Sequence, residues 1–186
     1  MLYMHNANKI IGTLVPLSAL RSVHSSQYGT IEAGIAFLDW LVKTRQNAWQ
    51  MLPLHETQLE PGLTTKHVPS PYKGYGIGLS PSYLSSASKQ IFPKEDDLEK
   101  FKEQHADWLP DYALFCALRD HFRTDDWTHW DREIRERNPL ALEKAKKEFG
   151  KQIRHYIQEQ WQSHNAYSAL RERAKRKRIL LVGDIP

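Results

Sequence analysis

The apolar residues of this chain form three short runs and several longer periodic stretches. The runs lie at residues 10–17, 48–54 and 179–182, and polar or turn-forming residues bound them. Short runs bounded in this way predict strands of a parallel sheet that is covered on both faces, so the first run is expected to be buried on two sides. The three runs therefore predict three strands.

Between the first two runs, apolar residues recur three and four positions apart, and Thr30 precedes them as a possible N-cap. This pattern predicts an amphipathic helix over about residues 31–46. A strand, a helix and a strand with tight connections form a right-handed parallel βαβ unit. Because parallel sheets carry functional groups at the carboxyl ends of their strands, His55 and Glu56 are expected on the functional rim.

Two long segments separate the second run from the third. Residues 57–92 are rich in Pro, Gly, Ser, Thr and Tyr and have no period, and their aromatic content predicts an ordered binding loop on the rim. Residues 94–177 are helical in pattern, and Pro110 and Pro139 mark helix starts or breaks. The chain is thus predicted to insert a large, mostly helical segment before its third strand.

The aromatic, cysteine and histidine side chains of the helical segment do not indicate a binding or catalytic site. Trp127, Trp130 and Trp161 are expected to pack between helices rather than to serve as sugar platforms. The single cysteine, Cys116, lies in an apolar pattern and is predicted to be a buried thiol. The histidines are scattered without metal-ligand spacing, so no metal site is predicted.

Composition narrows the class of protein further. The 186 residues are 40% hydrophobic and 26% charged, as in globular proteins, and no run approaches the roughly 18 apolar residues of a membrane span. The single cysteine and the lack of a secretory signal predict a cytoplasmic protein. The net charge is +4, and much of the excess lies in residues 171–178. That run could bind nucleic acid, but no aromatic residue is interleaved in it, so a solvated helix terminus is the preferred interpretation.

The third run ends in Gly183-Asp184 and the chain stops two residues later. Three strands do not close a barrel, and no helix follows the third strand. We therefore expect the chain to be truncated after its third strand and to be the first part of a larger enzyme.

Several blocks resemble one known family. The blocks are "GTLVPLSALRS" (12–22), "FLDWLVKTRQNAWQMLPL" (37–54), "SPY" (70–72), "SPSYLS" (80–85), "WLPDYALFCAL" (108–118) and "ILLVGDIP" (179–186). In this order they look like the amino-terminal portion of the 4-α-glucanotransferases, also called amylomaltases or disproportionating enzymes, of glycoside hydrolase family 77. The resemblance covers nearly the whole chain and roughly the first third of a typical member.

The resemblance implies an α/β fold: about the first three strands of a (βα)8 TIM-type barrel, with the helical segment inserted between strands 2 and 3. It implies a parent enzyme that moves α-1,4-glucan segments between maltooligosaccharides through a covalent glycosyl-enzyme, which needs two carboxyl groups. The family's nucleophile and acid/base follow later strands, so no catalytic residue is expected within residues 1–186. No cofactor and no metal are implied.

The resemblance also assigns three substrate-binding residues. Asp184 matches an aspartate after strand three that supports the sugar at the cleavage site, and Tyr72 matches a tyrosine beside the reacting bond. Ser70 borders the neighbouring acceptor side. Residues 73–81 depart from the family pattern, so the acceptor contacts are expected to differ.

Two other functions remain open from the sequence. The chain could act as a non-catalytic glucan-binding or interaction module through its tyrosine-rich loop, or as a nucleic-acid-binding helical protein through residues 171–178. The expected partner of the leading hypothesis is a maltooligosaccharide or α-1,4-glucan, with no nucleic acid and no membrane. The oligomeric state is not predicted.

Overall fold

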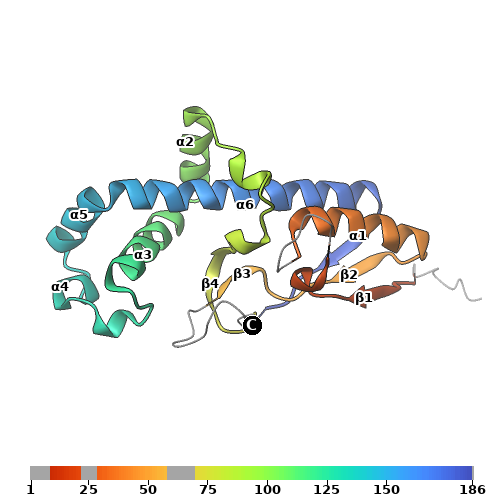
Figure 1. Cartoon of the computed structure of the whole chain (residues 1–186), viewed down its shortest axis with the longest axis horizontal. Helices are drawn as coiled ribbons and strands as arrows, with labels where there is room; N and C mark the ends of the chain where they lie inside the picture. The colour runs from red at the N-terminus through yellow and green to blue at the C-terminus, as the bar shows by residue number, and fades with distance from the viewer. Residues whose placement is uncertain (1–8, 22–28, 58–69, 186) are drawn as a thin grey trace, which may run out of the picture.

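The computed structural model describes residues 9–21, 29–57 and 70–185 of the chain. Within these ranges a three-stranded parallel sheet and a two-stranded hairpin are joined by α-helices, and one long helix runs along most of the molecule (Figure 1). The strands are β1 (Gly12–Leu14), β2 (Ala48–Gln50), β3 (His55–Thr57), β4 (Gly74–Leu79) and β5 (Leu180–Val182). The α-helices are α1 (Ile31–Lys43), α2 (Glu95–Gln104), α3 (Leu109–Phe122), α4 (Arg132–Arg135), α5 (Pro139–Glu148) and α6 (Gly150–Arg176).

The parallel sheet has the strand order β1-β2-β5. Ala48 in the central strand pairs with Gly12 on one side and Leu180 on the other. The strands approach closely at Gly12, where an added Cβ would lie 2.6 Å from the Ala48 carbonyl oxygen. The predicted βαβ unit and the third parallel strand are therefore confirmed.

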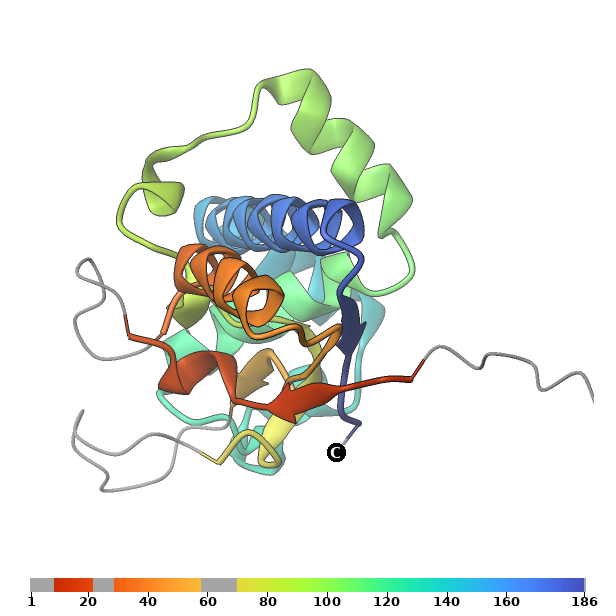
Figure 2. The same cartoon turned by 90° about the vertical axis from the view of Figure 1, so that its right-hand side faces the viewer.

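Helix α1 forms where the hydrophobic pattern predicts it and packs over the sheet. The Thr30 hydroxyl accepts a hydrogen bond from the Ala33 amide, which confirms the predicted N-cap. Leu38 and Leu41 are buried against Trp49 of β2 in a core that α6 closes from above (Figure 2). This core fixes β2 and β5 relative to the two helices.

The prediction that the first run is buried on both sides is wrong. Ile10, Ile11 and Leu14 are exposed, and Ile10 keeps 68% of its surface. The reason is positional: β1 is an edge of the sheet in the described part of the chain, and α1 covers one face only. The apolar composition of the run did not reveal this exposure, because a strand covered on one face can have the same composition as a strand covered on both faces.

Residues 57–92 are not a loop throughout. Strand β4 pairs antiparallel with β3, with His55 opposite Leu79 and Thr57 opposite Gly74. Residues 58–69, which were part of the predicted binding loop, lie outside the described residues. The glycine-rich stretch forms a strand because its backbone groups form hydrogen bonds with β3. The position of β3 depends on the tertiary structure, and an alternating hydrophobic pattern in the sequence does not predict this pairing.

The segment 94–177 is helical, as predicted, and α6 is its spine. Pro110 lies in the first turn of α3 and Pro139 begins α5. Helix α6 contacts α1, α2, α3 and α5, so it links the parallel sheet to the helical part (Figure 1). Cys116 is buried on α3, as predicted.

The tryptophans divide between core and surface. Trp130 is buried and stacks on Phe122 with ring centroids 5.5 Å apart, and Trp161 packs against the cluster of α2, α3 and α6. Trp127 is 53% exposed, so the prediction that it packs between helices is wrong. Trp127 begins the short turn 127–129 between α3 and α4, so it does not belong to an α-helix that packs against another.

The basic run ends helix α6, as predicted. Lys177 pairs with Asp39 on α1, and an Arg173 guanidinium nitrogen lies 4.0 Å from the same carboxylate. None of the helices in the described ranges is long and apolar enough to cross a membrane. Within these ranges, no cluster of three or more His, Cys, Asp or Glu side chains could hold a metal ion.

Candidate functional site

The structure brings Tyr72 and Asp184 together from positions 112 residues apart in the sequence. The Tyr72 hydroxyl donates a hydrogen bond of 2.7 Å to Oδ2 of Asp184. Asp184 follows β5 by two residues, and Tyr72 precedes β4 by two residues. The contact therefore lies at the carboxyl end of a parallel strand, where α/β proteins place ligand-binding groups.

The Tyr72 hydroxyl is fixed by a hydrogen bond, whereas about half of the residue is exposed to solvent. About half of the residue, 51%, stays exposed although its hydroxyl is engaged. The hydrogen bond to the Asp184 carboxylate, and to a smaller extent partial desolvation, raise the pKa of the Tyr72 phenol. The tyrosine is thus neutral at physiological pH and presents an aromatic ring next to an acidic side chain.

Ser70 belongs to the same turn. Its hydroxyl accepts a long hydrogen bond of 3.4 Å from the Tyr72 amide, and its carbonyl oxygen accepts one of 3.0 Å from the Lys73 amide. These bonds shape the backbone that carries Tyr72. All three residues predicted to bind substrate therefore meet in one place.

The arrangement offers two groups that can contact a polyhydroxylated ring. An exposed aromatic face can pack on the apolar face of a sugar, and a carboxylate accepts hydrogen bonds from hydroxyl groups. Hydrolysis or transfer of a glycoside by the common route needs a second carboxyl group. Glu56 does not supply it, because both of its oxygens already accept hydrogen bonds from helix α3.

Sequence reasoning missed the polar cluster that engages Glu56. Arg119 and Gln160, from α3 and α6, are buried and reach the hairpin β3–β4. The available signal was a polar residue on the apolar side of each helical pattern: Arg119 follows Cys116 by three residues, and Gln160 follows Ile157 by three residues. The pattern could not tell which partner each side chain would find.

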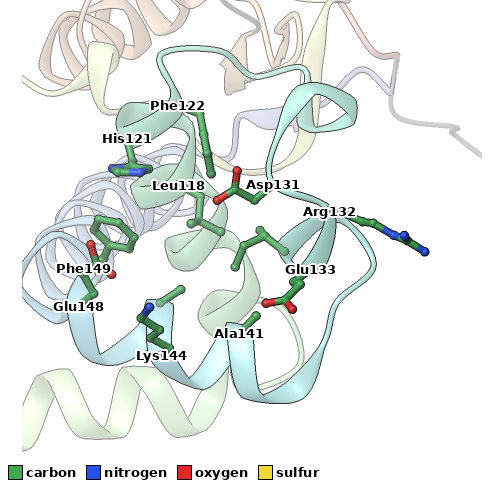
Figure 3. Close-up of a pocket in the computed structure, with 12 residues that line it drawn as sticks. Leu118, His121, Phe122, Asp131, Arg132, Glu133, Ala141, Lys144, Glu148 and Phe149 are labelled. Carbon is green, nitrogen blue, oxygen red and sulfur yellow. The ribbon is translucent and has the colours of Figure 1, made fainter.

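A separate hollow of about 420 Å³ lies among helices α3, α4 and α5 (Figure 3). Phe122 and Phe149 lie on its walls together with charged side chains of both signs, and Arg132 points away from it. None of the residues predicted to bind substrate lines this hollow. The candidate site is therefore the open surface at Tyr72 and Asp184, and not this hollow.

Comparison with known proteins agrees with these observations. A family model described as 4-alpha-glucanotransferase, glycoside hydrolase family 77, matches residues 15–91 and 79–186. A 4-alpha-glucanotransferase of Aquifex aeolicus is 26% identical over 96% of this chain and 43% of its own length. One from Clostridium butyricum is 25% identical over 81% of this chain and 38% of its own length.

Solved structures share the fold. The amylomaltase of Streptococcus agalactiae, in complex with acarbose, superposes with a TM-score of 0.79 at 22% identity over 94% of this chain. That match covers 43% of the amylomaltase chain. The chain thus spans less than half the length of these relatives.

Proposed function

Because the chain belongs to the 4-alpha-glucanotransferase family, glycoside hydrolase family 77, we propose that it binds α-1,4-glucan at Tyr72 and Asp184 as the first part of a glucanotransferase barrel. In this proposal β1, β2 and β5 are the first three barrel strands, and the helices from α2 to α6 are an insertion between strands two and three. The parent activity is transfer of glucan segments between maltooligosaccharides, with retention at the sugar carbon.

The observation that supports this proposal best is the hydrogen bond between Tyr72 and Asp184. Two side chains matched independently to the family's sugar-binding positions lie 2.7 Å apart, although 112 residues separate them. A substrate role accounts for a large aromatic side chain that remains half exposed while its hydroxyl is fixed. The Tyr72 ring would pack on one glucose unit, and Asp184 would accept hydrogen bonds from its hydroxyl groups.

Residues 1–186 are proposed to bind glucan without transferring it. Transfer through a covalent glycosyl-enzyme needs a nucleophile and an acid/base about 5 to 5.5 Å apart. Glu56, the other carboxylate that the sequence places near a strand end, is engaged by Tyr112 and Arg119. Incubation of the purified chain with maltotriose should therefore yield neither glucose nor longer maltodextrins.

Binding is testable by titrating the chain with maltoheptaose and following amide chemical shifts of residues 70–74 and 183–185. Cellohexaose, whose glucose units are β-linked, serves as the control ligand. We expect shifts with maltoheptaose only, a large loss of affinity in Tyr72→Ala, and a smaller one in Tyr72→Phe, which keeps the ring but loses the hydroxyl. Equal responses to both sugars, or unchanged affinity in a folded Tyr72→Ala variant, would refute the substrate role.

A further inference from the structure

Glu56 is an acidic residue near the strand ends that the proposed function does not use. Its carboxylate accepts a hydrogen bond of 2.6 Å from the Tyr112 hydroxyl and one of 2.9 Å from the Arg119 guanidinium. The Arg119 side chain is 8% exposed and that of Glu56 is 21% exposed. Since each oxygen is bonded to helix α3, the residue holds strand β3 against that helix.

Gln160 holds the other strand of the hairpin. Its side chain is completely buried on α6, and its amide bonds both backbone groups of Leu79, each at 2.9 Å. In this way Gln160 takes the place of a neighbouring strand at the end of β4. It also donates a hydrogen bond of 3.1 Å to the Tyr112 hydroxyl, so the two attachments form one network.

The backbone allows this close contact only because Gly78 lies next to the network. Gly78 has φ +77, and a Cβ built on it would lie 3.0 Å from the Tyr112 ring and 3.2 Å from Oε1 of Gln160. A side chain at this position would be strained and would also push the network apart. The end of β4 is thus built to lie against α3 and α6.

The hairpin leads directly to the candidate site. Gly74, the first residue of β4, pairs with Thr57, which follows Glu56. An added Cβ at Gly74 would lie 2.1 Å from Cδ2 of His55, so the strand crosses the imidazole ring closely. Tyr72 stands two residues before Gly74, and its partner Asp184 follows β5 of the other sheet. The alignment of tyrosine and aspartate therefore depends on how the hairpin is held.

We propose that Glu56 and Gln160 are positioning residues that hold the β3–β4 hairpin on α3 and α6 so that Tyr72 meets Asp184. This inference rests on the proposed function, in which the Tyr72–Asp184 pair contacts the sugar. It assigns to Glu56 a role other than that of a reacting carboxylate. It also gives the helical segment a role at the sugar site, because Tyr112 and Arg119 come from α3 and Gln160 comes from α6.

The experiment must distinguish the electrostatic effect of a substitution at Glu56 from the loss of the hairpin's attachment to α3. Helix α3 presents Arg119, Tyr112 and Cys116 to Glu56. The charge of Glu56 also acts on Glu159 of α6, whose pKa is raised by burial and, to a smaller extent, by this charge. Burial, and to a smaller extent the Glu56 charge, raise the pKa of Cys116 to about 12. Substituting Glu56 therefore changes both an attachment and a charge, whereas Gln160 contributes an attachment without a charge.

The test places 3-fluorotyrosine at position 72 of the full 186-residue chain and follows the pH titration of its single ¹⁹F signal. Asp184→Asn defines the pKa without the carboxylate partner. We expect Glu56→Gln and Gln160→Leu each to remove about half or more of the pKa elevation of the parent, because the phenol no longer stays beside Asp184. Circular dichroism verifies that each variant is folded.

Two controls isolate the positioning effect. Glu159→Gln removes a nearby negative charge and leaves the hairpin attachments intact, and Leu98→Val destabilises the core under α2 without touching the hairpin. Both should titrate like the parent. Parent-like titration of folded Glu56→Gln and Gln160→Leu variants would overturn the proposal, and so would an equal pKa decrease in Glu159→Gln. No sugar is used, so this outcome is independent of whether maltoheptaose binds.

Discussion

Substitution of Trp49 by phenylalanine tests whether the central strand depends on one side chain. Trp49 is fully buried on β2, its ring meets Phe37 edge-on at 5.0 Å, and its indole N–H donates a hydrogen bond of 2.8 Å to the Val15 carbonyl oxygen. The ring thus joins α1, β2 and the segment after β1. Phenylalanine keeps most of the apolar volume but removes the donor and part of the ring.

The expected loss can be estimated from these contacts. Removing the two extra ring carbons costs about 1.5 kcal/mol of transfer free energy. Losing the hydrogen bond to Val15 costs about 1 kcal/mol, and the residual cavity adds up to about 1 kcal/mol. The free energy of unfolding should therefore fall by about 3 kcal/mol, which lowers the melting temperature by about 6–12 °C for a domain of this size.

Urea and thermal unfolding of the parent and the variant measure this loss. Trp40→Phe is the matched control, because Trp40 lies on α1, is 48% exposed and stacks on the same Phe37 ring. Its effect should stay within about 1 kcal/mol. Equal losses in the two variants, or a loss below about 1 kcal/mol for Trp49→Phe, would refute the reasoning.

Three further predictions concern single side chains. Burial and, to a smaller extent, the neighbouring His105 lower the pKa of His164 from 6.5 to about 4. The unfolded chain therefore binds this proton first, so stability that is present above pH 6.5 should be lost as the pH falls toward 4. The difference between these pKa values corresponds to about 3 kcal/mol, which solvent screening at this partly exposed side chain reduces to about 2 kcal/mol. Urea titrations should find this pH dependence reduced in His164→Phe. The buried Cys116 thiol, with its pKa raised to about 12, should react with a disulfide reagent only as fast as the chain unfolds, so rapid modification of the native protein would contradict its placement. Arg45 has φ 60, so Arg45→Gly should raise the free energy of unfolding by up to about 1 kcal/mol in urea titrations, whereas Lys43→Gly within α1 should lower it.

The sequence supplied the residues of the candidate site as a prediction, but it did not supply their contacts. Tyr72, Asp184 and Ser70 were identified from family-like blocks, and the structure places them together. The hydrogen bond between Tyr72 and Asp184 could not be read from the sequence, because it joins two sheets whose relative position depends on α6. The role of Glu56 could not be predicted either, because a carboxylate near a strand end gives the same sequence pattern whether it contacts a ligand or an arginine.

The sequence by itself determined the three parallel strands, helix α1, the helical segment and the order of these elements. Hydrophobic spacing, the Thr30 cap and the two prolines at helix starts predicted α1, the parallel strands and the helical segment, because these signals act within a few residues along the chain. Tertiary structure alone decided which faces are covered. It left Ile10 and Trp127 exposed, made a strand from glycine-rich residues 74–79, and buried Gln160 against Leu79. These outcomes depend on partners far along the chain, such as Gln160 and Leu79, which are 81 residues apart, and a local pattern carries no information over that distance.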